Sequence, residues 1–335
     1  MTLLLTEDDI KSVLDMSKVV EAVEEAFKAY GEGRINMPAK TYLYLEDGDF
    51  RAMYGVIKGI RQGVDICGIK WVNVHPGNPK KGLPTVMAKI LLNDPETALE
   101  LADMDGTYVT DLRTGAAGAV AAKYLSRKDS RVAAFIGAGC QSKTQLWGLL
   151  NVRKLREARI YDIDQSKAKN FSEEMTKKFS LEVYSVDSVK EAVEDCDILT
   201  TVTPSRKPVV DLQSITDGMH INAIGADAKG KEELDPRILK KSRIVIDDWS
   251  QASHSGEINV PLEKGIISRK DIYGNLGEIV TGKKEGRVCD EEVTIFDSTG
   301  LIIQDLAVGY LAYTLCKEKK LGEEKSFLSR LNYLD

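Results

Sequence analysis

The sequence lacks the features of a membrane protein, a disulfide-stapled protein or a metal protein. No apolar run approaches the roughly 20 residues that a transmembrane helix needs. The five cysteines are an odd number without Cys-x-x-Cys spacing, and the three histidines are not spaced like metal ligands. We therefore expect no metal, no disulfide framework and a reducing compartment. The residues concerned are Cys67, Cys140, Cys196, Cys289 and Cys316, and His75, His220 and His254.

The sequence also lacks an excess of basic residues. The formal net charge is −6, and both signs are spread along the chain, so no basic face that could neutralise a nucleic-acid backbone is expected. The segment Met1–Asp9 has no basic region followed by a long apolar stretch, which is unlike a secretory signal. These absences predict a cytoplasmic protein with neither nucleic acid nor membrane as a partner.

What is present is the composition of a globular protein, with 43% hydrophobic and 29% charged residues and no internal repeats. A chain of 335 residues is long enough for two domains, because single hydrophobic cores stop growing near about 250–300 residues. We expect residues 1–112 together with 300–335 to form one discontinuous domain. Residues 113–299 are expected to form the other.

The first domain is predicted to combine amphipathic helix with a mainly antiparallel sheet. Apolar residues recur at helical spacing from Ile10 to Phe27, after a helix start at Thr6 and with a break near Ser17. Short segments rich in β-formers follow, separated by Gly, Pro, Asn and Asp. We place strands at residues 42–45, 51–54, 67–74 and 85–92, and helices at 110–125 and 301–317. The charged end, residues 317–325, is expected to be solvated.

The second domain is predicted to be a Rossmann-type, doubly wound parallel sheet, because strand and helix patterns alternate along it. The fold class is therefore α/β, with a second α+β domain. Strands are expected at residues 131–138, 159–163, 181–186, 197–202, 220–225 and 243–247, with helices at 165–179 and 189–196 among them.

A dinucleotide-binding motif follows the first of these strands. Residues 137–142 read GAGCQS, an apolar strand running into GxGxxS at the start of a helix. Gly137 permits the tight turn, Gly139 lets the backbone approach a pyrophosphate, and the helix start attracts negative charge. Ser142 stands where the common pattern has Gly or Ala, and it is still small enough for close packing.

An acidic residue strengthens this prediction. Asp162 lies 23 residues after Gly139 at the end of the next strand, near the roughly 20-residue offset of an acid that binds the adenosine ribose. A carboxylate there repels a 2′-phosphate, which favours NAD over NADP. The alternative is a helix N-cap or a solvated loop acid. Thr203, in a Thr-Pro-Ser segment after another strand, is a further candidate at the same sheet edge, or merely part of a turn.

Three charged residues are candidates for the chemistry. Lys70 has apolar and aromatic neighbours, so desolvation is expected to lower its pKa toward the range useful for proton transfer. The alternative is a lysine on the solvent face of an alternating strand. Arg51 has the planar fork that suits a substrate carboxylate, unless it is a surface residue. Asp227, flanked by small residues after a strand, could accept a proton from water or could only cap the next segment.

Six motifs stand out together along the chain. They are KWVNVHPGNP (70–79), GLPTV (82–86), LRTGAAG (112–118), GAGCQ (137–141), IGADAKGK (224–231) and FDSTG (296–300). Together they resemble the ornithine cyclodeaminase/μ-crystallin family over nearly the whole chain. The segments NAIGAD (222–227), ELD (233–235) and HSGEIN (254–259) look most like the archaeal alanine dehydrogenase branch. Lys229 departs from the family, which often has Pro there, and this would loosen the loop of Asp227.

The resemblance implies a homodimer joined through the sheet of the first domain, with NAD on the Rossmann domain and a small amino acid or 2-oxo acid held between domains. It makes Lys70 the catalytic and substrate-binding lysine, Asp227 its acid/base partner and Arg51 a substrate ligand. The implied cofactor contacts are Thr85, Arg113, Thr114, Gly137, Gly139, Cys140, Gln141, Asp162, Thr203, Lys231 and Ser298.

The leading hypothesis is reversible NAD-dependent oxidative deamination of L-alanine to pyruvate and ammonia. The first alternative is an ornithine cyclodeaminase, which converts L-ornithine to L-proline and ammonia. Its substrate needs an anionic partner for the distal ammonium, and Glu46, Asp47 and Asp49 are the acids nearest in sequence. The second alternative is a non-catalytic, μ-crystallin-like protein that binds NAD(P).

Overall fold

A computed structural model describes residues 1–61 and 63–326. The chain forms two compact units, Met1–Arg113 with Ile302–Asp335 and Thr114–Leu301. Both are mixtures of helix and strand, so the predicted α/β class is confirmed. None of the five cysteines is paired. No helix among the described residues is long and apolar enough to cross a bilayer, and the cytoplasmic location stays a prediction.

Local hydrogen bonds explain where the first unit's helices begin. Thr6 starts α1 (Glu7–Lys11) through a capping box in which Thr6 and Asp9 satisfy each other's backbone N–H groups. The carboxylate of Asp15 accepts the N–H of Lys18 and starts α2 (Met16–Gly31). The predicted helical segment therefore contains two helices, and the break lies just before Ser17.

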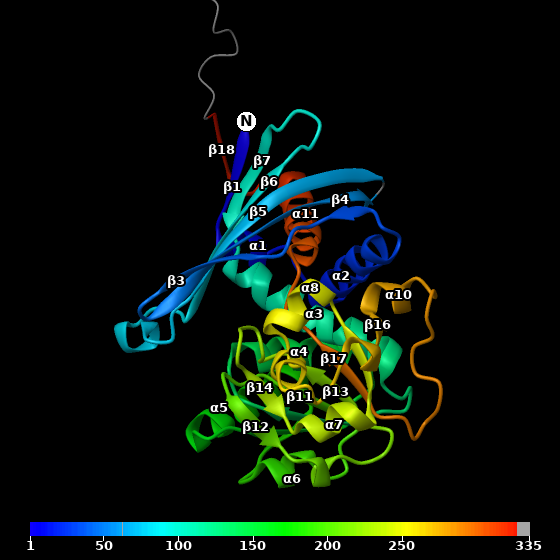
Figure 1. Cartoon of the computed structure of the whole chain (residues 1–335). Helices are drawn as coiled ribbons and strands as arrows, with labels where there is room; N and C mark the ends of the chain where they lie inside the picture. The colour runs from blue at the N-terminus through cyan, green and yellow to red at the C-terminus, as the bar shows by residue number, and fades with distance from the viewer. Residues whose placement is uncertain (62, 327–335) are drawn as a thin grey trace, which may run out of the picture. The chain divides into compact units, whose positions relative to one another are not determined.

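The sheet of the first unit has the strand order β18-β1-β7-β6-β5-β4-β2, with β3 paired to β4. Among the strand pairs of this sheet that the described residues form, only β1 with β7 is parallel, so the expected mainly antiparallel sheet is confirmed. Helices α2 and α11 (Ile302–Lys319) pack on this sheet (Figure 1). The strands are β1 (Thr2–Leu5), β2 (Ile35–Asn36), β3 (Thr41–Leu45), β4 (Gly48–Ile60), β5 (Val64–Val74), β6 (Val86–Asn93), β7 (Glu100–Asp105) and β18 (Glu323–Lys325).

The charged segment at residues 317–325 is largely exposed, as predicted, and its last residues also form a strand. Residues 323–325 form β18, which pairs with β1 in antiparallel register, Thr2 opposite Lys325. Their side chains are exposed, as a solvated end requires, but their backbone completes one edge of the sheet. A charge run at a sheet edge is also a common protection against pairing with other chains.

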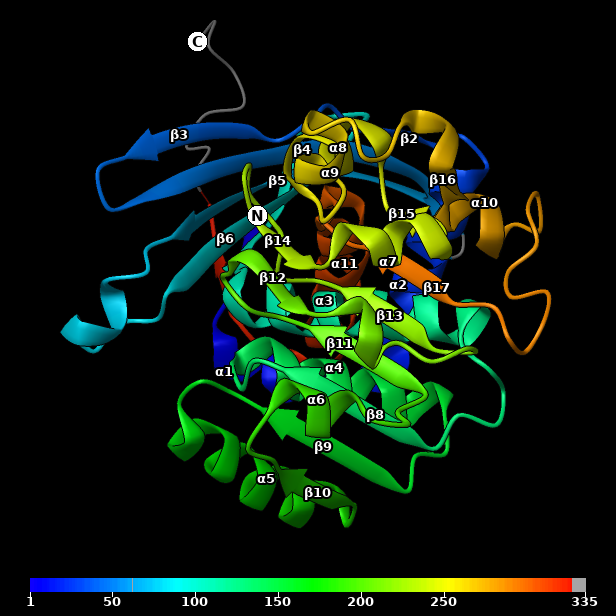
Figure 2. The same cartoon turned by 60° about the horizontal axis from the view of Figure 1, so that its bottom comes forward.

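The second unit is a parallel sheet of order β10-β9-β8-β11-β13-β17-β15-β16 (Figure 2). The strand order reverses beside β8, which makes the sheet doubly wound as predicted. The strands are β8 (Val132–Ile136), β9 (Glu157–Tyr161), β10 (Glu182–Ser185), β11 (Ile198–Thr201), β13 (His220–Ala223), β15 (Arg243–Ile246), β16 (Ile272–Asn275) and β17 (Thr294–Asp297), with a separate pair β12 (Arg206–Val210) and β14 (Glu232–Leu234).

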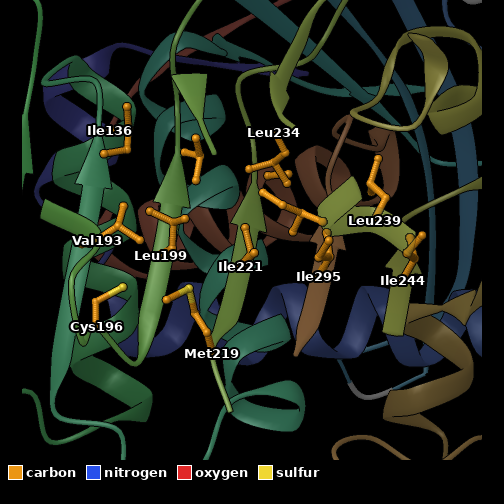
Figure 3. Packing of buried hydrophobic residues seen from close by; sticks show 14 of the residues in the cluster. Ile136, Val193, Cys196, Leu199, Met219, Ile221, Leu234, Leu239, Ile244 and Ile295 are labelled. Atoms are coloured by element: carbon orange, nitrogen blue, oxygen red, sulfur yellow. The ribbon is translucent and has the colours of Figure 1, made fainter. Parts of the chain in front are cut away.

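Both faces of the sheet are buried at β8, which explains why this strand is continuously apolar. In β8, Val132, Ala134 and Ile136 belong to one core cluster, whereas Ala133 and Phe135 belong to another. Figure 3 shows the first cluster, with apolar side chains of successive strands lying side by side. The helices are α3 (Thr107–Leu125), α4 (Cys140–Val152), α5 (Gln165–Phe179), α6 (Val189–Val193), α7 (Pro236–Lys241), α8 (Trp249–Ser255), α9 (Asn259–Glu263) and α10 (Leu276–Val280), and the 3-10 turns are η1 (Asn78–Lys81), η2 (Leu212–Ser214) and η3 (Arg269–Asp271).

The small-residue segment of α3 allows the close helix packing that the sequence suggests. A Cβ on Gly115 would lie 2.3 Å from the carbonyl oxygen of Thr144 in α4. A Cβ on Gly148 would in turn lie 2.5 Å from the carbonyl oxygen of Gly115. Only glycine fits at these two positions, and the contact fixes α4 and hence the glycine loop that precedes it.

Candidate functional site

The glycine loop of the second unit connects β8 to α4. Gly137 has φ +103°, and a Cβ there would lie 2.9 Å from the carbonyl oxygen of Val202, so another residue would be both strained and crowded. Gly139 is the N-cap of α4, and a Cβ built on it would meet no atom within 4 Å. The helix therefore starts at a bare backbone with open space in front of it, as an approaching phosphate requires.

Ser142 fits the third position of the motif without disturbing it. Its side chain is fully buried, and its hydroxyl donates a hydrogen bond to the carbonyl oxygen of Gly137. The serine thus ties the first turn of α4 back to the loop.

Asp162 lies against this loop, directly after β9. One carboxylate oxygen accepts the N–H of Ala138 at 2.7 Å, and the other accepts the N–H of Asp164 at 2.8 Å. The N-cap of α5 is Asp164, so the alternative role of Asp162 as a helix cap is wrong. The half-buried carboxylate stands at the glycine loop, where an acid that binds a ribose is expected.

Four other predicted cofactor ligands lie in the second unit around the carboxyl edge of its sheet. Cys140 is exposed and Gln141 is partly exposed in the first turn of α4. Thr203 follows β11, and its Cγ2 would lie 3.2 Å from a Cβ on Gly137. Ser298 is buried after β17, and its N–H donates to the carbonyl oxygen of Ala223 at 3.0 Å.

Thr114 is placed differently from these residues. It lies in α3, is buried, and its carbonyl oxygen accepts a hydrogen bond from Gln145 at 2.8 Å.

The glycine loop and its surroundings fit a dinucleotide. The crowded turn at Gly137, the open helix start at Gly139 and the acid after β9 suit a pyrophosphate on Gly139 and an adenosine ribose on Asp162.

Lys70 is the centre of a second group of residues, in the first unit. It lies on the inner face of β5 with 1% of its surface exposed, so the alternative of a solvent-facing lysine is wrong. Its Nζ lies 2.8 Å from Oδ2 of Asp305 and 3.4 Å from Oγ1 of Thr110. Strand β5 and helices α3 and α11 thus each supply one side chain.

Asp305 bridges Lys70 to a second cation. Its other oxygen accepts the Nε–H of Arg113 at 3.0 Å, and Arg113 also donates to Oε1 of Gln304. The pKa of Lys70 is lowered to about 7, chiefly by burial and also by the charge of Arg113, while Asp305 acts in the opposite direction. The expected desolvation is found, and Lys70 can hold or release a proton near neutral pH.

Arg51 lies close to Lys70 on the same face of the sheet. Lys70 pairs with Met53 and Arg51 pairs with Val72, so the two cations are diagonal neighbours, roughly 7–8 Å apart at their backbones. Arg51 is buried and donates to both carboxylate oxygens of Asp49, at 2.7 and 3.3 Å.

Two charged members of this group were not identified from the sequence. Asp305 is fully buried in the apolar part of α11, and an acid next to Gln304 in an otherwise apolar stretch of helix was the available signal. Lys40 is 9% exposed and its charge also lowers the pKa of Lys70, but nothing in its neighbourhood in the sequence marks it.

Thr85 is not brought into the group of hydrogen bonds around Lys70. It lies half-buried just before β6, and its carbonyl oxygen accepts the N–H of His75 at 2.8 Å. Its predicted contact with the cofactor stays a prediction.

Asp227 and Lys231 form an ion pair at 2.5 Å in the loop after β13. Asn259 holds this loop, because its side chain accepts the N–H of Gly230 at 2.9 Å and donates to the carbonyl oxygen of Lys231 at 2.8 Å. Arg206 donates to the carbonyl oxygen of Lys229 at 3.1 Å. These bonds restrain the loop that lacks the family's proline.

No cluster of residues suited to a metal ion occurs among residues 1–61 and 63–326. The predicted site residues fall into two groups. In the first unit, Lys70 and Arg113 lie around Asp305. In the second unit, the group consists of the glycine loop, Asp162, Thr203 and the Asp227–Lys231 pair.

Comparison with known proteins connects both groups to one family. The chain is 50% identical to an alanine dehydrogenase of Archaeoglobus fulgidus over 97% of its own length and 98% of that protein. Its fold matches an archaeal alanine dehydrogenase dimer solved with bound NAD, with a TM-score of 0.93, 49% identity and coverage of 98% and 99% of the two chains.

A second solved structure is as similar in fold. It is the Δ1-pyrroline-2-carboxylate reductase of Thermococcus litoralis in complex with NADH and L-proline, with a TM-score of 0.93, 41% identity and coverage of 97% and 100% of the two chains. The model of the ornithine cyclodeaminase/mu-crystallin family matches residues 1–320, and the chain belongs to this family.

Proposed function

We propose that this chain catalyses the reversible NAD-dependent oxidative deamination of L-alanine to pyruvate and ammonia. The observation that carries the proposal is the buried Lys70, with a pKa of about 7, in a chain half identical to an alanine dehydrogenase. The chain is an NAD-dependent enzyme of a family of amino-acid dehydrogenases, reductases and cyclodeaminases. The family assignment does not specify the substrate, and L-alanine is proposed as that substrate.

The residues divide the work as follows. The glycine loop and Asp162 would hold NAD, which would supply the acceptor for the hydride of the substrate α-carbon. Arg51 and its neighbouring cations bind the substrate carboxylate, since a guanidinium matches a carboxylate in shape and charge. Lys70 accepts the proton that the substrate amine loses and returns it in the reverse reaction. Asp227 activates the water that hydrolyses the imine.

The ornithine cyclodeaminase alternative has little support from the acids that could bind a distal ammonium. Asp49, the nearest of them to Arg51, is paired with that arginine at 2.7 Å. Glu46 and Asp47 are exposed in the turn between β3 and β4.

Reduction of Δ1-pyrroline-2-carboxylate to proline is the second candidate, favoured by the 41% identical reductase solved with L-proline. It involves the same hydride exchange at a carbon that carries a carboxylate and a nitrogen. The difference is that its imine is cyclic and is not hydrolysed.

One set of assays separates the candidates. L-Alanine with NAD is expected to accumulate NADH, and pyruvate with ammonia to consume it. Conversion of L-ornithine to L-proline without net NADH would identify a cyclodeaminase, and NADH oxidation by Δ1-pyrroline-2-carboxylate alone would identify the reductase. No turnover with any amino acid or oxo acid, while NADH binds, would support the non-catalytic alternative.

A pair of lysine variants tests the role of Lys70. Lys70→Ala is expected to abolish turnover and to leave NADH binding intact, because the glycine loop is unchanged. Lys89→Ala is the matched control, since Lys89 lies on the neighbouring strand with 59% of its side chain exposed. Near-normal turnover by Lys70→Ala would contradict the assignment.

We also propose a homodimer formed through the first unit's sheet. Its outer face exposes Tyr54, Trp71 and Met87 on three adjacent strands, where a monomer would expose apolar surface to water. The related archaeal alanine dehydrogenase was solved as a dimer, which supports this assignment.

A further inference from the structure

Four buried carboxylates form a chain of contacts at the carboxyl edge of the second unit's sheet. Each of them is completely inaccessible to solvent. Each accepts hydrogen bonds from backbone N–H groups of a different segment, so that together they connect the segments that follow several strands. The four residues are Glu233, Asp247, Glu257 and Asp297.

The first three contacts run from β15 to β14. Asp247 accepts the N–H groups of residues 299 and 300 at 2.6 and 2.8 Å, just after β17. Asp297, the last residue of β17, accepts those of residues 257 and 258 at 2.9 and 3.1 Å. Glu257 accepts the N–H of Glu233 at 3.0 Å and that of Leu234 at 2.7 Å.

Glu233 ends the chain at the segments that carry predicted site residues. Its Oε1 accepts the N–H and the hydroxyl of Thr203 at 2.6 and 2.7 Å, and its Oε2 accepts the N–H of Gly225 at 2.9 Å. One carboxylate therefore joins the end of β11 to the end of β13. Asp227 lies two residues beyond Gly225.

The atoms around the Glu233 carboxylate are closely packed. A Cβ on Gly225 would lie 2.3 Å from the carbonyl oxygen of Thr203 and 2.6 Å from Oε2 of Glu233. The separation of the two strand ends is thus fixed by hydrogen bonds and by van der Waals contact together. A charged acceptor makes these bonds stronger than neutral ones.

We propose that Glu233 is a positioning residue of the proposed dehydrogenase, which clamps the Thr203 segment to the Asp227 loop at the spacing that the nicotinamide half of the dinucleotide requires. Glu233 does not touch substrate. The inference rests on the proposed function for its catalytic consequence, but its effect on dinucleotide binding can be measured without any turnover.

The chain of carboxylates also explains how a buried charge is tolerated there. Burial raises the pKa of Glu233, and the hydrogen bonds that its carboxylate accepts from Thr203 and Gly225 oppose this shift by favouring the ionised form. Burial and the charges of Glu233 and Asp297 raise the pKa of Glu257 well above its ordinary value. Glu257 thus keeps its proton and limits repulsion within the chain.

The test is Glu233→Gln, which keeps the shape but replaces one acceptor oxygen by an NH₂ group that cannot accept the bonds of Thr203 or Gly225. We expect the Kd for NADH, from fluorescence, to rise at least fivefold and kcat to fall at least tenfold. The Kd of adenosine monophosphate, measured by its displacement of NADH, probes the Asp162 end and is expected to change less than twofold. A purely structural role would change both ligands alike.

Glu232→Gln is the matched control. Glu232 lies beside Glu233 on β14, is also buried, and pairs with Lys264 at 3.2 Å instead of with the clamped segments. Glu232→Gln is expected to lower the free energy of unfolding and to change the Kd values of NADH and adenosine monophosphate by similar factors.

A second variant keeps the proposal testable if Glu233→Gln does not fold. Gly225→Ala inserts a methyl group between Thr203 and Glu233 without changing charge. It is also expected to raise the Kd of NADH more than that of adenosine monophosphate. Unchanged NADH binding in a folded Glu233→Gln or Gly225→Ala protein overturns the inference. Absence of alanine turnover in the unaltered protein refutes only the proposed function, because the binding measurements stand without it.

Discussion

Replacing Asp305 by asparagine tests how the protein sets the protonation of Lys70. The carboxylate lies 2.8 Å from Nζ of Lys70 and 3.0 Å from Nε of Arg113. Asparagine keeps the shape and removes the charge. Because Asp305 raises the pKa of Lys70 and Arg113 lowers it, the substitution leaves only influences that lower this pKa below about 7.

The size of the change follows from the distance. Two unit charges 2.8 Å apart interact by about 6 kcal/mol at an effective dielectric constant of about 20, and by about 1.5 kcal/mol in water. At about 1.4 kcal/mol per pKa unit, the pKa of Lys70 is expected to fall by roughly 1 to 4 units. The lower bound already exceeds the precision of a pH profile.

The assay is the pH dependence of kcat/KM in both directions. In oxidation, neutral Lys70 accepts a proton, so the rate of the unaltered enzyme is expected to rise with pH through about 7. In reduction, protonated Lys70 donates it, so the rate is expected to fall as pH rises through the same value. Both transitions should move at least about 1 unit lower in Asp305→Asn.

Two controls accompany this measurement. Breaking a buried ion pair costs about 3–5 kcal/mol, so urea denaturation must establish that Asp305→Asn is folded in the assay. Asp103→Asn removes a carboxylate paired with Lys89 on the outer face and should leave both transitions in place. A transition that stays at the same pH in Asp305→Asn, or one with the same sign in both directions, refutes the assignment to Lys70.

Three further substitutions test other parts of the structure. Asp162→Ser is expected to increase the kcat/KM ratio of NADPH to NADH at least about tenfold, because the carboxylate that repels a 2′-phosphate is removed. Gly137→Ala should lower the free energy of unfolding in urea by about 1–3 kcal/mol, because φ is +103° and Val202 lies 2.9 Å from the new Cβ. Trp71→Glu should shift sedimentation from dimer to monomer, and a dimer that survives it would place the interface elsewhere.

Local patterns were sufficient to predict many elements of the fold, but not the strands β1, β2, β7, β12, β14, β16, β17 and β18. The helix at residues 165–179 agrees with α5 at both ends, because Asp164 is an N-cap and the apolar residues keep helical spacing. Strands β1 and β18 were not predicted as strands, because each is only a few residues long and exists through its pairing with distant segments. Such pairing is a tertiary property that a short window of sequence does not contain.

The candidate site was predictable where the residues of a motif are close in sequence and their spacing determines how they lie in the structure. The glycine loop and Asp162 are of this kind, since turn, helix start and the next strand end are fixed by sequence spacing. Asp305 is 235 residues from Lys70 in the sequence, and only the fold brings the two together. Glu233 was noticed as part of a motif. Its contacts with Thr203 and Gly225 could not be predicted, because Glu233 lies on the two-stranded β12–β14 sheet and the other two residues follow strands of the large sheet.

Alanine oxidation and pyrroline-2-carboxylate reduction differ in one step, and that step assigns a separate task to Asp227. Both need a bound carboxylate and a proton carrier near neutral pH, which Arg51 and Lys70 supply in the proposed mechanism. Only the open-chain imine must exchange with water, because the cyclic imine keeps its nitrogen. Asp227→Asn is therefore expected to slow alanine oxidation at least about a hundredfold, in the range of a lost general base. If Δ1-pyrroline-2-carboxylate is also a substrate, its reduction should change much less, and equal losses in both reactions would mean that Asp227 serves the hydride step instead of the water.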